Sequence, residues 1–408
     1  MREMNVPFFR PSITAADIKE VTECLASGWL TTGPRVKAFE EAFANYVGAR
    51  HAIAVNSCTA ALHLALEAVG IQRGDLVLVP AMTFAATAEV VRYFDAVPVF
   101  VDCTRDTLCL DVAEAARTAE AIRAARPVAG LNPPYGPLRA VIPMHYGGQM
   151  VNVDAVRRMA DKYELAVVED AAHTLPADYR TDAHSPWRRV GTTGDITCFS
   201  FYANKCITTG EGGMAVTDSA DLADRMRVMS LHGMNKDAWK RFTAQGSWYY
   251  EIVAPGFKYN MTDLAGAIGL TQLQRAGEFL KGRQRVAEWY LRELSGTTEL
   301  QLPQELSDRR HSWHLFPIFL QLDRLRIDRA SFIDELKARG VTTSVHWMPL
   351  PLQPYYVKTY GFQPGTFPIA ESLWPQLVSL PVFPTMTEAE CAHVVAAVRE
   401  ICTEQRRA

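Results

Sequence analysis

Short apolar runs alternate with helical stretches from about residue 15 to residue 217, and this alternation restricts the possible folds more than any other feature of the sequence. Several intervening stretches repeat apolar residues every three or four positions, as amphipathic helices do. Short apolar strands joined by helices predict a mostly parallel seven-stranded sheet with helices on both faces. The strands are expected at residues 51–55, 76–80, 97–101, 140–144, 165–169, 196–201 and 213–216.

The sequence pattern changes after about residue 265. We expect a helix over residues 264–280 that continues to about residue 294, followed by a smaller set of elements. These are strands at 313–322 and 341–346 and helices at 327–339 and 391–401. The sequence thus predicts a large α/β domain over residues 1–265 and a smaller α+β domain over residues 266–408. Two Pro/Gly-rich segments, 125–138 and 178–193, are interpreted as surface insertions.

The charge balance excludes several classes of protein. With 42 basic and 45 acidic residues, the net charge of −3 predicts no polycationic surface for nucleic acid. No apolar run is long enough to span a bilayer, and the first residues lack the features of a signal peptide. The eight cysteines show neither CxxC spacing nor a zinc-like His offset, so no metal site is predicted. We expect a cytoplasmic protein that binds neither nucleic acid nor membrane.

A single lysine follows an apolar strand in the sequence CFSFYANKCITTGEGG (residues 198–213). Most lysines are solvated at the protein surface, and Lys205 considered by itself is compatible with that interpretation. A partly desolvated lysine, however, has its ammonium form disfavoured, which makes the amine a usable nucleophile. Phe201, Ile207 and nearby glycines give Lys205 a setting of this kind.

A second candidate element is VVEDAAH (residues 167–173), where an apolar strand ends in two carboxylates. Asp170 can cap the following helix, or it can pair with a cationic nitrogen such as the pyridinium of pyridoxal phosphate (PLP). In the second case the carboxylate keeps the ring protonated and therefore an electron sink. His173 would then lie over or beside the ring, although a core histidine is the competing interpretation.

A third element, NSCTAALHLAL (residues 56–66), leads from a strand into a helix N-terminus. Backbone amides and hydroxyls at such a position bind anions, although simple capping by Ser57 or Thr59 is equally compatible with it. Ser200 offers another hydroxyl, and Phe84 is placed either in the core or against an aromatic ligand. All these residues follow predicted strands, where ligands bind in parallel sheets.

At these positions the sequence resembles the DegT/StrS-type sugar aminotransferases, which are fold-type I PLP enzymes. The resemblance runs along nearly the whole chain. Its ten ordered blocks are SGWLTTGP (27–34), SCTAALHLAL (57–66), PAMTFAATA (80–88), PMHYGGQ (143–149), VEDAAH (168–173), FSFYANKCITTGEGG (199–213), LHGMNKDAW (231–239), PGFKYNMTDLAGAIGLTQL (255–273), SVHWMPLPLQPYY (344–356) and SLPVFPTMT (379–387).

The resemblance implies a role for each matching residue. Lys205 would be the Schiff-base lysine and the proton-transferring base, and Asp170 would pair with the pyridine nitrogen. The phosphate would be held by Ser57, Thr59, Ser200 and the backbone at Cys58, while Phe84 and His173 would sandwich the ring. Lys258 would reach the cofactor of a neighbouring copy. Departures from the family pattern are Cys58 for Gly, His173 for Gln, Phe84 for Trp and Lys258 for Asn.

The resemblance further implies a homodimer with shared active sites, in which PLP and its amino form (PMP) alternate during amino-sugar biosynthesis. The donor would be L-glutamate or L-glutamine, and the acceptor a nucleotide-linked 4-keto-hexose. KYN (258–260) and VEDAAH favour the 4-keto position. The alternatives are a 3-keto sugar nucleotide, a cyclitol or aminoglycoside intermediate, and a non-catalytic PLP-binding regulatory protein.

Overall fold

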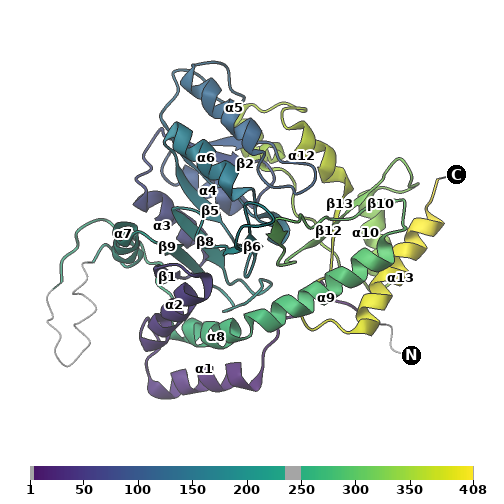
Figure 1. Ribbon diagram of the computed structural model, residues 1–408, viewed down its shortest axis with the longest axis horizontal. Helices are drawn as coiled ribbons and strands as arrows, with labels where there is room; N and C mark the ends of the chain where they lie inside the picture. The colour runs from purple at the N-terminus through teal and green to yellow at the C-terminus, as the bar shows by residue number, and fades with distance from the viewer. Residues whose placement is uncertain (1–3, 235–249, 408) are drawn as a thin grey trace.

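A seven-stranded sheet forms the centre of the larger part of the molecule (Figure 1). The computed structural model describes residues 4–234 and 250–407. In spatial order the strands are β1 (His51–Val55), β9 (Gly213–Thr217), β8 (Ile196–Ser200), β5 (Ala166–Asp170), β4 (Leu138–Val141), β2 (Leu76–Pro80) and β3 (Val97–Val101). Of these, β9 alone runs opposite to the other six strands. The predicted fold class is confirmed, and all seven predicted strands are present, with β4 beginning and ending earlier than expected.

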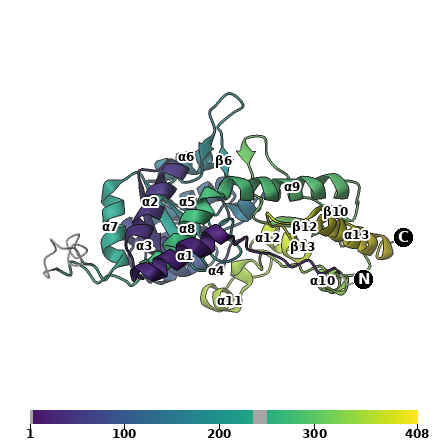
Figure 2. The ribbon, with the colours of Figure 1, turned by 90° about the horizontal axis from the view of Figure 1, so that it is seen from below.

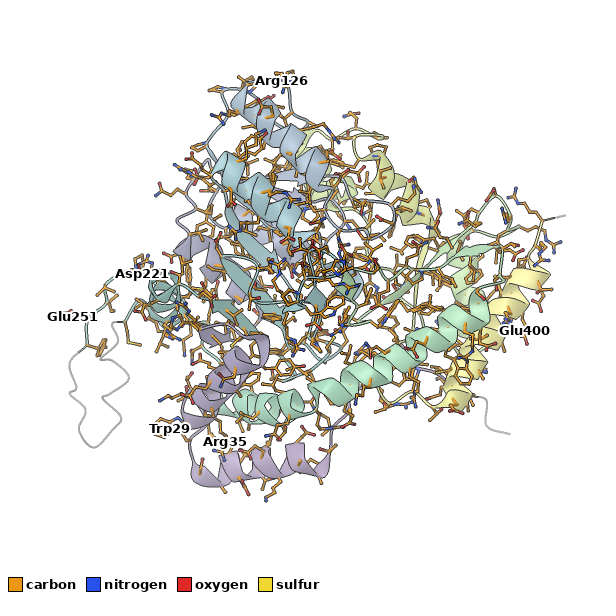
Figure 3. The ribbon with its side chains drawn as sticks, in the orientation of Figure 1. Trp29, Arg35, Arg126, Asp221, Glu251 and Glu400 are labelled. Atoms are coloured by element: carbon orange, nitrogen blue, oxygen red, sulfur yellow. The ribbon has the colours of Figure 1, made fainter. Side chains whose placement is uncertain are left out.

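Both faces of this sheet are covered, because β2 and β9 are buried along their full length. The helices of this part are α1 (Ala15–Ser27), α2 (Pro34–Val47), α3 (Cys58–Ala68), α4 (Ala85–Arg92), α5 (Val112–Arg123), α6 (Val153–Tyr163) and α7 (Ala220–Ser230). Arg35 on α2 lies near α1 (Figure 3). It forms an ion pair with Glu20 on that helix at 2.9 Å. Helix α3 begins just after β1, where the Ser57 hydroxyl accepts from the amide of Ala60 at 3.1 Å and caps the helix.

A second hydrophobic cluster surrounds a three-stranded sheet in the C-terminal part. Its strands are β10 (Leu300–Gln301), β12 (Phe316–Leu320) and β13 (Leu377–Leu380), and the helices of this part are α9 (Ala276–Leu294), α10 (Arg329–Ala338), α11 (Pro354–Tyr360), α12 (Pro368–Leu373) and α13 (Glu388–Glu404). Helix α8 (Asp263–Gln274) packs instead against α1 and α2 of the larger part. Phe362 and Phe367 pack instead into the first cluster. The predicted domain boundary after residue 265 stays a prediction.

The predicted strand at residues 341–346 is wrong. This segment forms only isolated bridges, from Val341 to Val6 and from Ser344 to Ser379. The third strand of the small sheet is β13 instead. Residues 342–344 (Thr-Thr-Ser) have no large apolar side chains to bury, whereas Val378 on β13 is fully buried in the second cluster.

Residues 178–193 form a hairpin rather than a plain loop. Its strands β6 (Asp178–Tyr179) and β7 (Arg188–Arg189) pair with each other, and β6 also pairs with β11 (Arg309–Arg310). The hairpin projects from the body of the molecule (Figure 2). None of the helices in the described part of the chain is both long and apolar enough to cross a bilayer. The cytoplasmic location stays a prediction.

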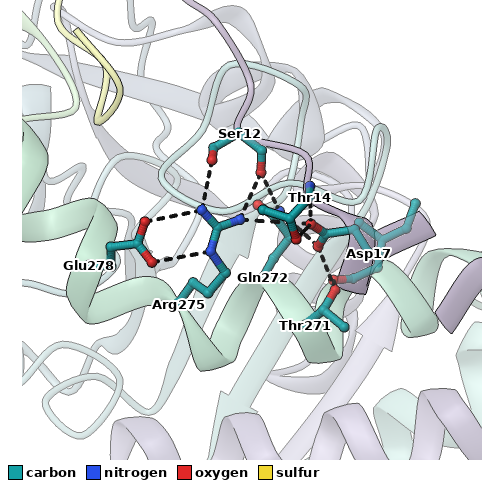
Figure 4. Close-up of polar contacts among 8 residues, drawn as sticks. Ser12, Thr14, Asp17, Thr271, Gln272, Arg275 and Glu278 are labelled. Atoms are coloured by element: carbon teal, nitrogen blue, oxygen red, sulfur yellow. Dashed lines mark hydrogen bonds and ion pairs between the residues drawn. The ribbon is translucent and has the colours of Figure 1, made fainter. Parts of the chain in front are cut away.

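The long helix predicted from residue 264 is broken at Arg275 into α8 and α9. The N-terminal segment holds this corner (Figure 4). The Arg275 guanidinium donates to the Ser12 hydroxyl at 2.8 Å, and the Asp17 carboxylate accepts from the Thr271 hydroxyl at 2.6 Å. Burial alone would raise the pKa of Asp17, but hydrogen bonds from Thr271 and Thr14 outweigh it and hold the pKa below its ordinary value of 3.8.

Replacing Asp17 with Asn is expected to lower the free energy of unfolding by about 2 kcal/mol near neutral pH, because a charged acceptor shared by several donors is lost. A carboxyl group with a depressed folded-state pKa stabilises the fold above its ordinary pKa, and this contribution disappears as the pH falls through the folded-state value. Urea unfolding should therefore show a difference between wild type and Asp17→Asn that shrinks below about pH 4. Glu23→Gln, a change of an exposed residue on the same helix, is the control. A difference that is unchanged in acid would contradict this account.

Candidate active site

A cavity of about 500 Å³ opens where β1, β5 and β8 end. Its lining combines these strand ends, the start of α3 and two segments of the C-terminal part that carry His314 and the pair His346 and Trp347. All of the predicted site residues except Lys258 line this cavity: Ser57, Cys58, Thr59, Phe84, Asp170, His173, Ser200 and Lys205. The sheet therefore gathers candidates that are far apart in the sequence, as parallel strand ends do.

Lys205 lies in the turn after β8, where its amide donates to the carbonyl of Tyr202 at 2.9 Å. The residue is half-buried, and its amine lies 3.5 Å from Nε2 of His314. Burial lowers the pKa of the Lys205 amine to about 8, against the opposing attraction of the Asp170 carboxylate. Burial also holds the pKa of His314 well below its ordinary value, so this imidazole is neutral. The site thus holds an amine that loses its proton only slightly above neutral pH.

Asp170 ends β5 and is the carboxylate of its strand that lines the cavity. It accepts from the Thr87 hydroxyl at 2.7 Å and from the amide of Ala172 at 3.1 Å. Burial raises the pKa of Asp170 although these bonds oppose the shift, so a cationic partner would stabilise its charged form. The adjacent Glu169 belongs to the opposite face of the strand, where it accepts from the Thr197 hydroxyl at 2.8 Å.

His173 is a buried, neutral histidine at the cavity wall. The amide of Gly147 donates to its Nδ1 at 3.2 Å, which assigns the imidazole proton to Nε2. Its ring centre lies 5.2 Å from that of Trp347, with the two planes 30° apart, and 4.2 Å from that of His314. Burial holds the pKa of His173 well below its ordinary value, and the charge of Lys205 acts in the same direction.

The start of α3 supplies donors for an anion. Ser57 caps the helix, so the amides of Cys58 and Thr59 in its first turn have no partner within the helix. These amides, the Thr59 hydroxyl and Ser200 all belong to the cavity lining, as an anion site at a helix N-terminus requires. Strand β9 passes close to this turn because Gly213 has no side chain: a Cβ there would lie 2.4 Å from the Ser57 carbonyl carbon.

Three residues of the C-terminal part were missed as site residues. His314, His346 and Trp347 line the cavity, and the Trp347 ring lies 6.0 Å from that of Phe84. Phe84 is 56% exposed, so it borders the cavity rather than filling the core. The one available signal was that His346 and Trp347 fall inside the matching block at 344–356. His314 lies in none of the ten blocks.

Lys258 does not line this cavity. Its amine donates to the side-chain carbonyl of Asn260, and its main-chain carbonyl accepts from Asn56 Nδ2 at 3.4 Å. The predicted contact of Lys258 with the cofactor of a neighbouring copy stays a prediction. The matching block at 231–239 extends past Met234 into positions outside the described residues.

The side chains around the cavity fit PLP. That cofactor requires a lysine amine, a carboxylate for its ring nitrogen, donors for its phosphate and flat surfaces beside its ring. Lys205, Asp170, the start of α3 and the rings of His173 and Phe84 offer these groups in one cavity. A buried lysine of lowered pKa beside a carboxylate is an arrangement suited to nucleophilic catalysis. Within the described residues, no three His, Cys, Asp or Glu side chains are grouped to hold a metal ion.

Comparison with known proteins agrees with this chemistry. The model of the DegT/DnrJ/EryC1/StrS aminotransferase family matches residues 11–399. The spore coat polysaccharide biosynthesis protein SpsC of Bacillus subtilis is 42% identical over 399 residues, which cover 97% of each chain. The family resemblance inferred from the sequence is therefore confirmed.

Solved structures confirm the fold and the cofactor. A Streptococcus pneumoniae protein assigned as a sugar aminotransferase superposes with a TM-score of 0.86 at 29% identity over 98% of both chains, and it has been solved in PMP and PLP forms. PseC of Helicobacter pylori, an aminotransferase involved in the biosynthesis of pseudoaminic acid, has a TM-score of 0.86 at 25% identity. That match covers 98% of this chain and 100% of PseC.

Lys205 should react with an amine-specific reagent at lower pH than an ordinary lysine when PLP has been removed. Because the unprotonated amine is the reactive form, we expect the labelling midpoint near pH 8, the value to which burial lowers its pKa. Peptide mass spectrometry across a pH series measures this midpoint. A midpoint at or above about pH 10, the ordinary lysine range, would show that the amine is well hydrated.

Proposed function

Since the chain belongs to the DegT/DnrJ/EryC1/StrS aminotransferase family, we propose that it moves an amino group from L-glutamate or L-glutamine to a nucleotide-linked 4-keto-hexose. The protein is a PLP-dependent sugar aminotransferase, and the proposal adds its donor and its acceptor. The observation that carries it is the convergence of the Lys205 amine, the Asp170 carboxylate and the start of α3 on one cavity.

In this proposal Lys205 both holds PLP and moves protons. Its amine would hold the cofactor covalently and, when free, would take up and return the substrate proton as a general base. When bound, PLP supplies the electron sink for the carbon that exchanges its amino group. A pKa of about 8 suits this role, because the amine neither holds its proton too tightly nor remains without one.

The remaining residues hold the cofactor in place. Asp170 keeps the ring nitrogen protonated, while Thr87 and Ala172 fix the direction of its carboxylate. His173 and Phe84 would flank the ring. The phosphate would be held by Ser57, Thr59, Ser200 and the backbone at Cys58. Each of these roles is supported by position in the cavity and by the matching family motif.

The nature of the acceptor is supported by the relatives and by the cavity. SpsC is named for spore coat polysaccharide biosynthesis and PseC for pseudoaminic acid biosynthesis, and we extend the amino-sugar assignment to this chain. A cavity of about 500 Å³ has the size of a small-molecule site. Trp347 and Phe84 offer apolar walls, while Tyr202, Asn204 and Glu211 in the lining offer partners for sugar hydroxyls.

Two copies of the chain sharing their active sites form part of the proposal. Lys258 is exposed and lies outside its own chain's cavity. Ile252 and Val253, a few residues before it, are 66% and 58% exposed. Adjacent exposed apolar side chains are typical of a surface that another protein covers. In the proposed dimer this surface meets the second copy, and Lys258 reaches its site.

Absorbance spectra of the PLP-loaded protein test the two half-reactions separately. L-glutamate should replace the visible band of the lysine-bound cofactor with the near-ultraviolet band of PMP, and L-glutamine serves as the alternative donor. A nucleotide-linked 4-keto-hexose should then restore the visible band, whereas the 3-keto isomer and a free cyclic ketone should not. Restoration by the cyclic ketone alone would identify a cyclitol aminotransferase. Failure to form any visible band with PLP would overturn the proposal.

Lys205→Ala should abolish the visible band and lower turnover at least about 100-fold, because the general base is lost. Asp170→Asn is the informative comparison: it should still take up PLP through Lys205 but transaminate more slowly, because the ring nitrogen loses its anionic partner. Lys281→Ala, a change of an exposed lysine on α9, controls for loss of a surface charge. Wild-type turnover in Lys205→Ala would exclude Lys205 from the reaction.

A further inference from the structure

Arg283 is a buried arginine near the middle of α9, and its side chain is 3% exposed. Its Nη1 donates to the main-chain carbonyls of Val382 at 2.7 Å, Trp313 at 3.3 Å and His314 at 3.4 Å. Its Nε has no hydrogen-bond partner, and it forms no ion pair with a described carboxylate. A guanidinium stays charged under all ordinary conditions, so burying it without a counter-charge opposes folding. Its presence here points to a role other than stability.

Arg283 holds the turn that carries His314. Trp313 has a φ of +50°, a left-handed conformation that a bulky residue adopts only when surrounding contacts hold it there. The Trp313 ring also stacks on His311, with ring centres 4.0 Å apart and planes 13° apart. The turn brings His314 into the cavity lining, where its Nε2 lies 3.5 Å from the Lys205 amine.

The charge of Arg283 also lies close to Lys205. Arg283 and Lys205 both line a second cavity of about 10 Å³. This cavity adjoins the main one, because Asn204 and Lys205 line both. After burial, which has the largest effect, Arg283 is among the groups that lower the pKa of the Lys205 amine. Three other groups, Asp170, Cys58 and Cys206, raise the pKa of this amine. The histidines near it, His173, His314 and His346, are neutral.

We propose that Arg283 is a positioning residue of the lysine site, which fixes the turn at Trp313 and His314 against Lys205 and keeps a permanent positive charge beside the amine. The three carbonyl bonds determine where His314 lies. The charge favours the neutral amine, which is the form that attacks a carbonyl carbon. A lysine at this position would lose the planar fork that reaches several carbonyls, and burial would lower the pKa of its amine, so its charge would not be permanent. The inference rests on the proposed function in taking the Lys205 amine as the reacting group.

The pH dependence of Lys205 labelling in the PLP-free protein tests this proposal. Arg283→Met removes both the charge and the carbonyl bonds, and we expect it to raise the labelling midpoint by roughly one pH unit. Arg283→Gln is equally neutral but keeps hydrogen-bond donors, so it replaces Arg283→Met if that variant does not fold. Arg283→Lys keeps part of the charge, because burial also lowers the pKa of the new amine, and it should raise the midpoint by less than half as much as the two neutral variants do. If Arg283 acted only by holding the turn, the labelling midpoint would shift equally in Arg283→Lys and in the two neutral variants.

Arg285→Met is the matched control, because Arg285 lies two residues further along α9 and donates to the carbonyl of Met386 instead. It should leave the midpoint unchanged. An unchanged midpoint in a folded neutral variant, or an equal rise in Arg283→Lys, would overturn the role of the charge. The visible band of the PLP-loaded wild type, and its loss in Lys205→Ala, test the proposed function independently, so the two ideas fail separately.

Discussion

Lys205 and Asp170 place opposite charges in a single cavity, and much of the surrounding structure keeps them there. The pairing of β5 with β8 aligns Asp170 with Cys198, so that β5 ends beside the turn that carries Lys205. Burial raises the pKa of Asp170 and lowers that of Lys205, while the attraction between them offsets part of both shifts. Each group therefore remains ready to bind a partner, the carboxylate a cation and the amine a carbonyl carbon.

Local patterns predict the elements that present most of the site. The strands of the central sheet have short apolar runs, and the position of Ser57 at the start of α3 follows from ordinary capping chemistry. The alternation of side chains along β5 explains why Asp170 lines the cavity and Glu169 does not. These features depend on neighbours in sequence, which is why the sequence alone places Lys205, Asp170 and His173 correctly at the strand ends.

Features that depend on distant contacts are the ones the sequence does not reveal. The long helix is broken at Arg275, whose side chain is bound to Ser12 near the N-terminus, and the sequence around Gly277 does not reveal that distant contact. The approach of His314 to Lys205 depends on a left-handed Trp313 and on Arg283. Trp347 meets His173 only once the C-terminal part has packed against the sheet. Tertiary packing determines each of these three features, and no periodic pattern in the sequence predicts them.

The walls of the cavity come from segments made at very different times during synthesis. The ribosome completes β5, which ends at Asp170, and the turn that carries Lys205 more than a hundred residues before His314 and Trp347 are made. Likewise, the segment before α1 cannot bind the corner between α8 and α9 until Arg275 has been synthesised. The Lys205 amine is thus hydrated on the growing chain, and burial lowers its pKa only once the pocket has formed around it. Secure capture of the cofactor is consequently one of the last events in making the enzyme, because an unfinished chain carries at Lys205 an ordinary lysine that is mostly protonated near neutral pH.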